Sequence, residues 1–407
     1  MKLSKEIIIV SLIFIFGFSV RFLYVINLPF SASFVGDSPS WEEPALNLLL
    51  KKNYGYTKRP PLYPFILAII YYFFGIHNVM AVKIFQSLLG GITCVIVYFI
   101  GKYTFSKFTG VISSVLLCFY PYLVYYTGVI LSEVTLSFFI SLLIFSLLIV
   151  YNHPKLHFIF LSGVILGMTA LCKPVIFAFY PFVILWFLVN YSNSIKVFLK
   201  YSLIFSLGII IIIFPWVMRN LFFYKGFLLI SPGWQEFWLT NNDVAIQLET
   251  VGPKDEPASD DWIWYPKERF QQILKLPMLE AERVFRKEAI EWVKKNPKKF
   301  IWLVYRRFLR FWRLWPYMAS KRDKIIAGVT SGVYLPLAWV GIVLSLIDKN
   351  YRVKSLLLFF LLVSYTLVYL PFHGMIRYRV PIDPIVLVFT GYTLHCVYEK
   401  IKGKFIK

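Results

Sequence analysis

Long apolar runs recur along the whole 407-residue sequence, and most of them approach the length that a helix needs to cross a lipid bilayer. A helix rises about 1.5 Å per residue, so about 20 apolar residues cover a hydrocarbon core of roughly 30 Å. Apolar residues make up 58% of the chain and charged residues only 16%, whereas soluble domains carry about 25% charged residues. The sequence therefore predicts an all-α, polytopic membrane protein.

About ten transmembrane helices are expected. The first, Ile7–Ile26, follows Lys2 and Lys5 as a signal peptide would, but its apolar run of about 20 residues exceeds a signal core. The other nine expected spans are Met80–Ile100, Phe108–Tyr126, Glu133–Tyr151, Leu156–Cys172, Val175–Asn190, Val197–Met218, Ile325–Ile347, Ser355–Pro371 and Val380–Val397. The run Pro61–Gly75 would reach only about 22 Å as a helix, so we interpret it as a juxtamembrane helix of the first external loop.

The lysines and arginines of the short loops predict the orientation in the membrane. If Pro61–Gly75 does not cross, 14 of them lie on the side of the termini and three lie opposite, as the positive-inside rule requires. If it does cross, the bias is reversed. Both termini are then expected in the cytoplasm, and the loops Leu28–Val79 and Arg219–Lys324 are expected on the extracytoplasmic side. In the second loop, Asn296–Met318 mixes aromatic and basic residues, which is typical of an interfacial amphipathic helix.

These loops divide the chain into three expected domains. Residues 1–218 form an N-terminal transmembrane module that includes the external loop 28–79. Residues 219–324 form a mixed external loop domain, and residues 325–407 form the C-terminal transmembrane helices.

Several classes of protein and site do not fit the sequence. All four cysteines fall inside apolar runs, so neither a disulfide framework nor a cysteine metal cluster is indicated. The second loop has no glycine-rich nucleotide fingerprint, and the chain has no Asp-x-Asp pair, so a soluble nucleotide is not the expected donor. The net charge of +22 is spread among membrane segments without a nucleic-acid recognition module. We therefore expect anionic membrane lipids, and no nucleic acid, as partners.

Ionisable residues gather at the external ends of the expected helices, where they could share one cavity mouth. They are Asp37, Arg59, Glu133, Lys173, Arg219, Arg377 and Arg379. Carboxylates flanked by cations at membrane depth suit a ligand that is half lipid, with an anionic headgroup at the interface and a hydroxyl to be activated. A lipid-linked phosphate fits this description.

The order of several motifs resembles one known family of membrane enzymes. The motifs are "GDSPSWEEPALNLL" from Gly36, "KRPPLYP" from Lys58, "YPYLVYYTGVILSEVTLSFF" from Tyr120, "ALCKP" from Ala170, "PWVMRN" from Pro215 and "RYRVPIDP" from Arg377. In this order the sequence resembles the C-type glycosyltransferases (GT-C), particularly the branch of the protein O-mannosyltransferases and the lipid A aminoarabinose transferase. The resemblance covers nearly the whole chain.

The resemblance implies a function on the outer face of the plasma (inner) membrane. Enzymes of this family take a sugar from a polyprenyl monophosphate carrier and transfer it to an acceptor, usually with inversion. The sugar and the acceptor, whether lipid, glycan or protein, are not readable from the sequence. A flippase or exporter of an anionic lipid-linked substrate would also need a basic cavity, and a non-catalytic membrane scaffold is a third interpretation. Transporters tend to show internal repeats and charges near the midplane, and we see neither in the sequence.

Two carboxylates are the expected catalytic residues. The resemblance implies that Asp37 is the general base, and a carboxylate within hydrogen-bond range of the acceptor hydroxyl can accept its proton. The alternative is a turn residue in "GDSP" that caps the next helix; Glu42 or Glu43 would then be candidate bases, as would Glu133. The resemblance implies that Glu133 positions the acceptor or binds a metal, whereas the alternative is a carboxylate favoured by a helix dipole. Because the family is divided on metals, no cofactor is certain and a divalent metal is possible.

Cations and aromatic residues are the expected substrate-binding residues. Arg377 and Arg379 flank Tyr378 and are suited to grip phosphate oxygens; the alternative is that they snorkel to lipid headgroups. Trp41 stands where relatives often carry Tyr, so it can stack on a sugar but lacks the phenolic hydroxyl. The remaining candidates are Lys58, Arg59 and Tyr63 of "KRPPLYP", together with Lys173 and Arg219, which are also placed as helix-end anchors.

The expected topology can be checked by labelling single cysteines from outside the cell. Cysteines introduced near Ser38 should react with an impermeant reagent, whereas cysteines near Lys155 or Asn350 should not, because the positive-inside rule places these loops on opposite faces. Labelling near Lys155 from outside would contradict the orientation.

Overall fold

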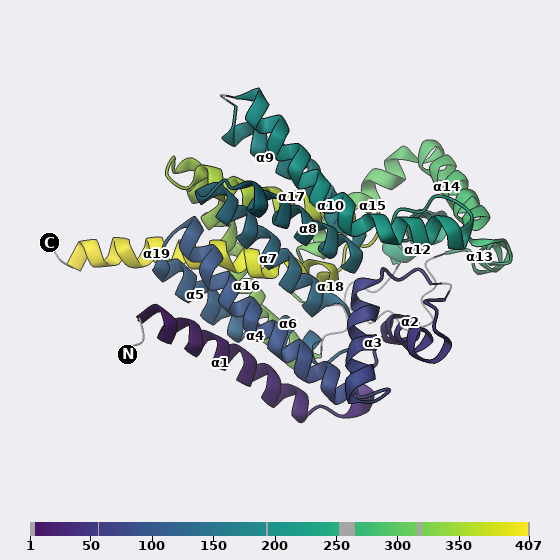
Figure 1. Ribbon diagram of the computed structural model, residues 1–407, viewed down its shortest axis with the longest axis horizontal. Helices are drawn as coiled ribbons and strands as arrows, with labels where there is room; N and C mark the ends of the chain where they lie inside the picture. The colour runs from purple at the N-terminus through teal and green to yellow at the C-terminus, as the bar shows by residue number, and fades with distance from the viewer. Residues whose placement is uncertain (1–4, 56, 193, 252–264, 316–319, 406–407) are drawn as a thin grey trace. The chain divides into compact units, whose positions relative to one another are not determined.

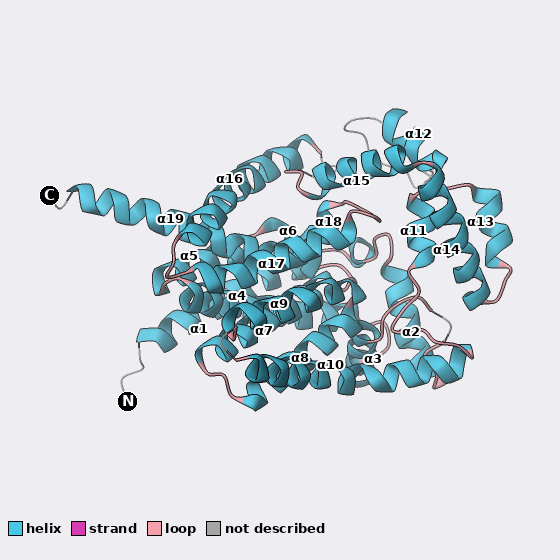
Figure 2. Ribbon diagram, turned by 90° about the horizontal axis from the view of Figure 1, so that it is seen from above, coloured by secondary structure: helices cyan, strands magenta, loops and turns pink. Residues whose placement is uncertain are grey.

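The computed structural model describes residues 5–55, 57–192, 194–251, 265–315 and 320–405, and within these ranges it contains helices and turns but no β-strand. Figure 1 gives the order of the helices, and Figure 2 shows the same molecule coloured by secondary structure. The prediction of an all-helical fold is confirmed. A membrane environment explains this result, because a helix satisfies its backbone hydrogen bonds within its own segment.

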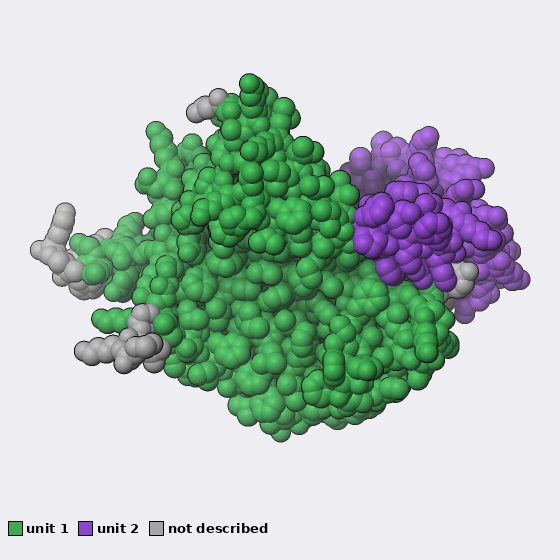
Figure 3. Space-filling view, in the orientation of Figure 1, with its two compact units in different colours: residues 1–213, 332–363, 380–407 green, residues 214–331, 364–379 purple. Residues whose placement is uncertain are grey.

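The chain divides into two compact units, which Figure 3 colours separately. Unit 1 consists of residues 1–213, 332–363 and 380–407, and unit 2 consists of residues 214–331 and 364–379. The units thus differ from the three consecutive domains expected from the sequence, since unit 1 combines segments from both ends of the chain. Unit 2 is built mainly from the second long loop.

Unit 1 contains the helices of the first half of the chain and the C-terminal helix. They are α1 (Lys5–Ile26), η1 (Phe30–Ser33), α2 (Ser38–Lys51), α3 (Leu62–Phe74), α4 (Val79–Thr104), α5 (Lys107–Cys118), α6 (Pro121–Thr127), α7 (Glu133–Asn152), α8 (Leu156–Cys172), η2 (Pro174–Phe179), α9 (Tyr180–Asn190), η3 (Val380–Ile382) and α19 (Asp383–Phe405).

Unit 2 contains the shorter helices of the second loop and of the segment before η3. They are α11 (Trp234–Thr240), α12 (Asp243–Val251), α13 (Lys267–Leu274), α14 (Met278–Lys295), α15 (Pro297–Phe311) and α18 (Ile376–Arg379). Three helices contribute residues to both units, namely α10 (Ile195–Tyr224), α16 (Lys321–Ile347) and α17 (Arg352–Tyr369).

All ten apolar runs expected to span the membrane are helical. Among the described residues, seven helices are long and apolar enough to cross, and the bent pair α5 and α6, with an angle of 52° between them, would make an eighth span. The other two expected spans form shorter apolar helices, α8 and the run Pro174–Asn190. The 17 residues of α8 reach about 25 Å at 1.5 Å per residue. The 13-residue α3 is shorter still, as expected for a juxtamembrane helix.

Helices α1 and α4 approach each other closely where both carry glycine. A Cβ atom added to Gly17 would lie 3.0 Å from the sulfur of Cys94, and one added to Gly91 would lie 3.2 Å from the backbone nitrogen of Phe18. Small residues allow such close packing in membranes, where van der Waals contact drives helix association. Figure 1 shows α1 lying along α4 in unit 1.

A buried arginine holds the break between α5 and α6. The Arg21 side chain of α1 is 1% exposed and donates hydrogen bonds to the carbonyls of Leu117 (3.1 Å) and Cys118 (3.3 Å). These carbonyls stand at the end of α5, where the helix stops supplying N–H donors; the Leu117 carbonyl also accepts a hydrogen bond from the backbone N–H of Tyr120 (3.2 Å). A Cβ at Gly90 would lie 2.4 Å from Arg21, so this glycine makes room for the guanidinium stem. Arg21 therefore replaces missing backbone donors inside the apolar unit.

The first long loop, between α1 and α4, folds mainly as a helical pair that places Asp37 at the start of α2. Helices α2 and α3 pack through Trp41, Ala45, Tyr63, Leu67 and Tyr71, all of them buried. The positive φ of Gly36, +50°, allows the turn that leads into α2. This packing fixes the direction of α2 and therefore the position of the carboxylate at its beginning.

Unit 2 has its own small core and an amphipathic helix. Trp238, Ile273, Phe285 and two alanines pack together between α11, α13 and α14. Helix α15 lies within the expected interfacial segment Asn296–Met318, of which residues 316–318 are outside the described residues. It exposes the side chains Ile301, Tyr305, Phe308 and Leu309. Exposed apolar and aromatic residues on a basic helix are typical of a helix that lies in the headgroup layer.

The role of Arg21 can be tested by substitution with methionine, which keeps the length of the side chain but donates no hydrogen bond. We expect Arg21→Met to lower the free energy of unfolding by about 1.5 to 3 kcal/mol, the range of hydrogen bonds that involve a charged group. Denaturation with SDS in mixed micelles measures the change. Arg352→Met is the control, because Arg352 also donates to two helix-terminal carbonyls, those of Leu346 and Ile347, but is exposed. Equal losses in both variants would contradict the interpretation.

Candidate active site

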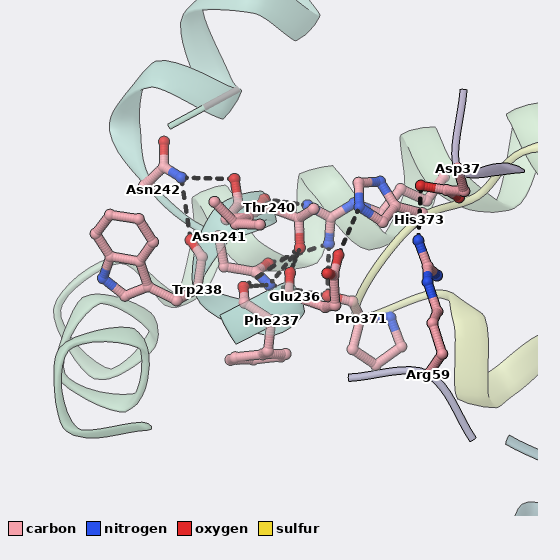
Figure 4. Close-up of polar contacts among 12 residues, drawn as sticks. Asp37, Arg59, Glu236, Phe237, Trp238, Thr240, Asn241, Asn242, Pro371 and His373 are labelled. Atoms are coloured by element: carbon pink, nitrogen blue, oxygen red, sulfur yellow. Dashed lines mark hydrogen bonds and ion pairs between the residues drawn. The ribbon is translucent and has the colours of Figure 1, made fainter. Parts of the chain in front are cut away.

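Asp37 does not use its side chain to cap α2. It occupies the N-cap position, but its carboxylate makes no capping hydrogen bond. Instead, Oδ1 lies 2.9 Å from Nη2 of Arg59, as Figure 4 shows. Ser40 completes the arrangement, because it accepts a hydrogen bond from Arg59 Nε (2.9 Å) and donates one to the backbone carbonyl of Asp37 (2.7 Å). The Asp37 side chain is 41% exposed, so a substrate can reach the carboxylate while Arg59 orients it.

Trp41 is covered by its neighbours. It is 1% exposed, the guanidinium carbon of Arg59 lies 4.9 Å from its ring centre, and Tyr63 meets it edge-on at 5.7 Å. A sugar could stack on Trp41 only after Arg59 moved. The geometry therefore favours Trp41 as a platform for Arg59, a cation–π contact, over the sugar platform expected from the sequence.

Tyr63 connects the first long loop to α4 and to the turn after α6. Its hydroxyl donates to Gln86 Oε1 (3.1 Å), and the Gln86 amide donates to the carbonyls of Thr127 and Val129 (2.9 Å each). Burial raises the pKa of the Tyr63 phenol well above its ordinary value, and Tyr71 and Glu133 act in the same direction. Tyr63 therefore positions the loop as a neutral phenol, and it lies near enough to Glu133 to interact with it electrostatically.

Glu133 and Lys173 form a buried ion pair. Glu133 is the first residue of α7, where the helix N-terminus favours a carboxylate. Its Oε1 lies 3.3 Å from Nζ of Lys173, and the two side chains are 0% and 14% exposed. This position agrees with a carboxylate favoured by the helix dipole, and a role in acceptor positioning or metal binding stays a prediction. The sequence did not predict that Lys173 would be its partner. The pair joins α7 to the residue that follows α8.

Unit 1 therefore brings together most of the residues that the sequence predicted for it. Asp37, Arg59 and Trp41 are in direct contact, and Tyr63 links them to the neighbourhood of Glu133. Lys58 is exposed beside Arg59.

Glu42 is a buried carboxylate whose partners the sequence did not reveal. It is 5% exposed, its Oε1 accepts a hydrogen bond from the Tyr71 hydroxyl (2.5 Å), and Nδ1 of His77 lies 3.1 Å away. Burial and the bond to Glu42 raise the pKa of Tyr71. Glu42 thus holds α2 against the end of α3 and is poorly placed to serve as an alternative base. Glu43, by contrast, is exposed.

In unit 2 the two arginines of "RYR" have different surroundings. Arg379 is fully buried and donates to the carbonyls of Phe311 (3.2 Å) and Arg313 (2.8 Å), at the C-terminal end of α15. Arg377 is half-buried, beside the ring of Tyr378. A cation at a helix C-terminus satisfies carbonyls that have no intrahelical donor. The geometry therefore favours a structural role for Arg379 and leaves Arg377 as the candidate for phosphate binding.

Arg307 is a second structural arginine that the sequence did not single out. It is 3% exposed and donates to Asn241 Oδ1 (3.0 Å), to the carbonyl of Pro371 (2.9 Å) and to that of Thr240. Figure 4 shows this network around Asn241 and Pro371. Burial lowers the pKa of Arg307 to about 9, so the side chain stays charged at neutral pH. The sequence signal that could have identified Arg307 is a charged residue on the buried face of an amphipathic helix. By binding the carbonyl of Pro371, Arg307 fixes the segment that precedes Arg377.

Arg219 lies among the aromatic rings of its own helix. Its guanidinium carbon is 5.0 Å from the ring centre of Trp216, 4.1 Å from that of Phe223 and 5.4 Å from that of Tyr224. The sequence allowed two roles for Arg219, substrate binding or anchoring of the helix end, and these ring contacts agree with the anchor. Because Arg219, Arg377 and Arg379 belong to unit 2, a cavity mouth shared with the residues of unit 1 stays a prediction.

A divalent metal would require a change in the contacts of both candidate carboxylates. Asp37 and Glu133 each bind a cationic side chain, which provides the positive charge that a metal ion would otherwise supply. Within the described ranges, no group of three or more His, Cys, Asp and Glu side chains is placed to hold a metal ion.

A family model matches part of the chain. Residues 58–218 match the family of dolichyl-phosphate-mannose-protein mannosyltransferases. The matched segment contains Arg59, Tyr63, Glu133 and Lys173, whereas Asp37 lies before it. No curated protein matches the chain.

Solved structures match the fold of almost the whole chain. The Archaeoglobus fulgidus oligosaccharyltransferase tethered with an acceptor peptide is 14% identical, with a TM-score of 0.62, over 98% of this chain and 50% of that one. The oligosaccharyltransferase AglB from the same organism, in complex with an inhibitory peptide and a dolichol-phosphate, is 13% identical, with a TM-score of 0.61, over 98% and 51%. ArnT from Cupriavidus metallidurans, bound to undecaprenyl phosphate, is 14% identical, with a TM-score of 0.44, over 97% and 78%.

The family match and the oligosaccharyltransferase structures confirm the resemblance drawn from the motifs. The chain has the helical membrane fold of the GT-C glycosyltransferases, and it spans about half the length of the oligosaccharyltransferases that it matches.

The different roles of the two arginines of "RYR" can be separated by measuring stability. We expect Arg379→Gln to lower the free energy of unfolding by about 1.5 to 3 kcal/mol, the range of hydrogen bonds that involve a charged group. Arg377→Gln should lower it by less, because the Arg377 side chain is half-buried whereas that of Arg379 is fully buried. Thermal unfolding in detergent measures both variants. A stable Arg379→Gln variant would return Arg379 to the list of phosphate-binding candidates.

Proposed function

We propose that this chain is a membrane glycosyltransferase that transfers a sugar from a polyprenyl-phosphate carrier to an acceptor on the extracytoplasmic face, with inversion. The observation that carries the proposal is the accessible Asp37 carboxylate, oriented by Arg59 at the start of α2. The GT-C fold and the family match over residues 58–218 support the class of reaction.

Asp37 acts as the general base. The acceptor hydroxyl attacks the anomeric carbon of the sugar, and its proton passes to the Asp37 carboxylate as the new bond forms. A base must be within hydrogen-bond reach of that proton, which requires a carboxylate that solvent and substrate can approach. Asp37 meets this requirement, whereas Glu42 and Glu133 are buried and bound to neighbouring side chains.

The polyprenyl phosphate leaves as an anion, so the departing side needs positive charge more than a proton donor. In unit 2 the candidate for this charge is Arg377, which lies half-buried beside the ring of Tyr378. Lys58 and Arg59 are the candidates of unit 1, with Arg59 also oriented by Ser40. The matched AglB structure contains a dolichol-phosphate, which supports a lipid phosphate as the carrier.

The ion pair of Glu133 and Lys173 positions the acceptor side of the site. Its burial makes it costly to separate, since a single charge left in that place would lack a partner. It therefore serves as a rigid support beside Tyr63 and the external loop. The acceptor can be a lipid, a glycan or a protein, and the matched structures contain peptides.

The test of Asp37 uses two variants of the same helical segment. Asp37→Asn keeps the shape of the side chain but removes the basic site, so we expect transfer to fall by about 100-fold to 10,000-fold, the usual contribution of general base catalysis. Glu43→Gln is the matched control, because Glu43 is an exposed carboxylate of the same segment. Transfer of a labelled sugar from a polyprenyl phosphate to a membrane extract is the measurement.

Donor binding and melting temperature are measured on the same preparations. An Asp37→Asn variant that folds, binds the donor and transfers sugar at the normal rate would refute the role of Asp37. If neither the native chain nor the Glu43→Gln variant transfers sugar while both bind a lipid-linked donor, the flippase or exporter becomes the better interpretation.

A further inference from the structure

Two adjoining hollows form one groove between α1 and α4, away from the candidate active site. Their volumes are about 430 Å³ and 420 Å³, and they share Val10 and Ser11. The first hollow is also lined by Phe14, Ile15, Ile92 and Val95. The second is also lined by Glu6, Ile7, Phe99, Lys102 and Tyr103. We call the two together the α1/α4 groove.

The groove exists because the two helices touch closely at one level and carry larger side chains at another. Near Gly17 and Gly91 the backbones approach within van der Waals contact. Further toward the N-terminus of α1, the facing residues sit at helical spacing on both helices, as Val10 and Phe14 do on α1 and Val95 and Phe99 do on α4. The side chains leave a channel that runs along the helices.

The middle of the groove suits hydrocarbon better than water. A water molecule takes up about 30 Å³ in the liquid, so about 430 Å³ has the volume of more than ten waters. Apolar side chains line it, and Ile7, Ile15 and Ile92 are 39 to 55% exposed at its edges. In a membrane these exposed side chains face lipid. An acyl chain can therefore enter from the side.

The end of the groove near the N-terminus is charged. Glu6 and Lys102 form an ion pair there, and the Tyr98 hydroxyl donates to Glu6 (3.1 Å). Lys107 is near enough to act on Glu6 electrostatically, and Lys5 adjoins Glu6 in sequence and is exposed. Three lysines thus accompany one carboxylate, which gives this end a net positive charge.

We propose that the α1/α4 groove binds one anionic phospholipid of the bilayer. One acyl chain lies in the apolar channel between α1 and α4, and the headgroup phosphate meets Lys5, Lys102 and Lys107. Charge complementarity selects the headgroup, and the channel holds the chain. The positive-inside rule assigns this end to the cytoplasmic leaflet, so this lipid is distinct from the lipid-linked donor proposed for the extracytoplasmic face.

The test compares two phospholipids with the same acyl chains, phosphatidylglycerol and phosphatidylcholine, bound to the full chain in native mass spectrometry. We expect the native protein to retain phosphatidylglycerol preferentially. Each lysine near an anionic headgroup contributes roughly fivefold to binding, so Lys107→Gln should weaken retention by roughly fivefold and Lys102→Gln with Lys107→Gln by more. Lys196→Gln with Lys200→Gln is the control, since these exposed lysines begin α10 and do not line the groove.

A second variant tests the channel without changing charge. Ser11→Phe fills the middle of the groove and should lower phosphatidylglycerol retention several-fold, while the melting temperature confirms that the protein still folds. If the double lysine variant does not fold, Ser11→Phe and Lys107→Gln test the proposal on their own. Lys107→Gln leaves the ion pair of Glu6 with Lys102 intact.

Three results would overturn the proposal. Equal retention of the two phospholipids would mean ordinary lipid contact with a membrane surface. An equal loss in the Lys196 and Lys200 control would assign the selectivity to the general basic charge of the chain. Displacement of the bound lipid by stoichiometric polyprenyl phosphate would assign the groove to the carrier lipid.

Discussion

Every buried backbone carbonyl requires a hydrogen-bond donor, and the rest of this structure depends on how that requirement is met. Within a helix the backbone N–H groups supply these donors. At each break or helix end inside the apolar units, the last carbonyls have no N–H donor from their own helix. Side chains with several N–H groups serve these places. Arg21 does so at the end of α5, Gln86 at the turn after α6, and Arg379 at the end of α15. Lys354, which donates to the carbonyl of Tyr103, repeats the arrangement after α4.

The same need separates the basic residues into two groups. Arg21, Arg307 and Arg379 are buried and bind backbone carbonyls, so they stabilise the fold. Arg59 and Lys173 bind carboxylates, and these are the cations that accompany the candidate catalytic residues. Only the second group has contacts that suit it to a site.

The first long loop shows how burial assigns different roles to neighbouring carboxylates. Asp37 and Glu42 are five positions apart, one at the beginning of α2 and the other within it. Glu42 faces Tyr71 and His77 and fixes α2 in place, while Asp37 stays accessible and is oriented by Arg59. The fixed helix is what allows the accessible carboxylate to have a defined position. Asp383 is another carboxylate that holds structure, since Tyr120 donates to it at the start of α19.

The sequence by itself determined the helical membrane fold, the short helix α3 and the motifs that carry the GT-C resemblance, because apolar run length and residue order are local properties of the chain. It could not determine that Lys173 pairs with Glu133, that Arg59 covers Trp41, or that Arg379 binds the end of α15. These contacts join residues that are distant in sequence, and their geometry depends on how the helices pack. A carboxylate or an arginine looks the same in a sequence whether it is buried or accessible, and the tertiary structure alone decides which partner it meets.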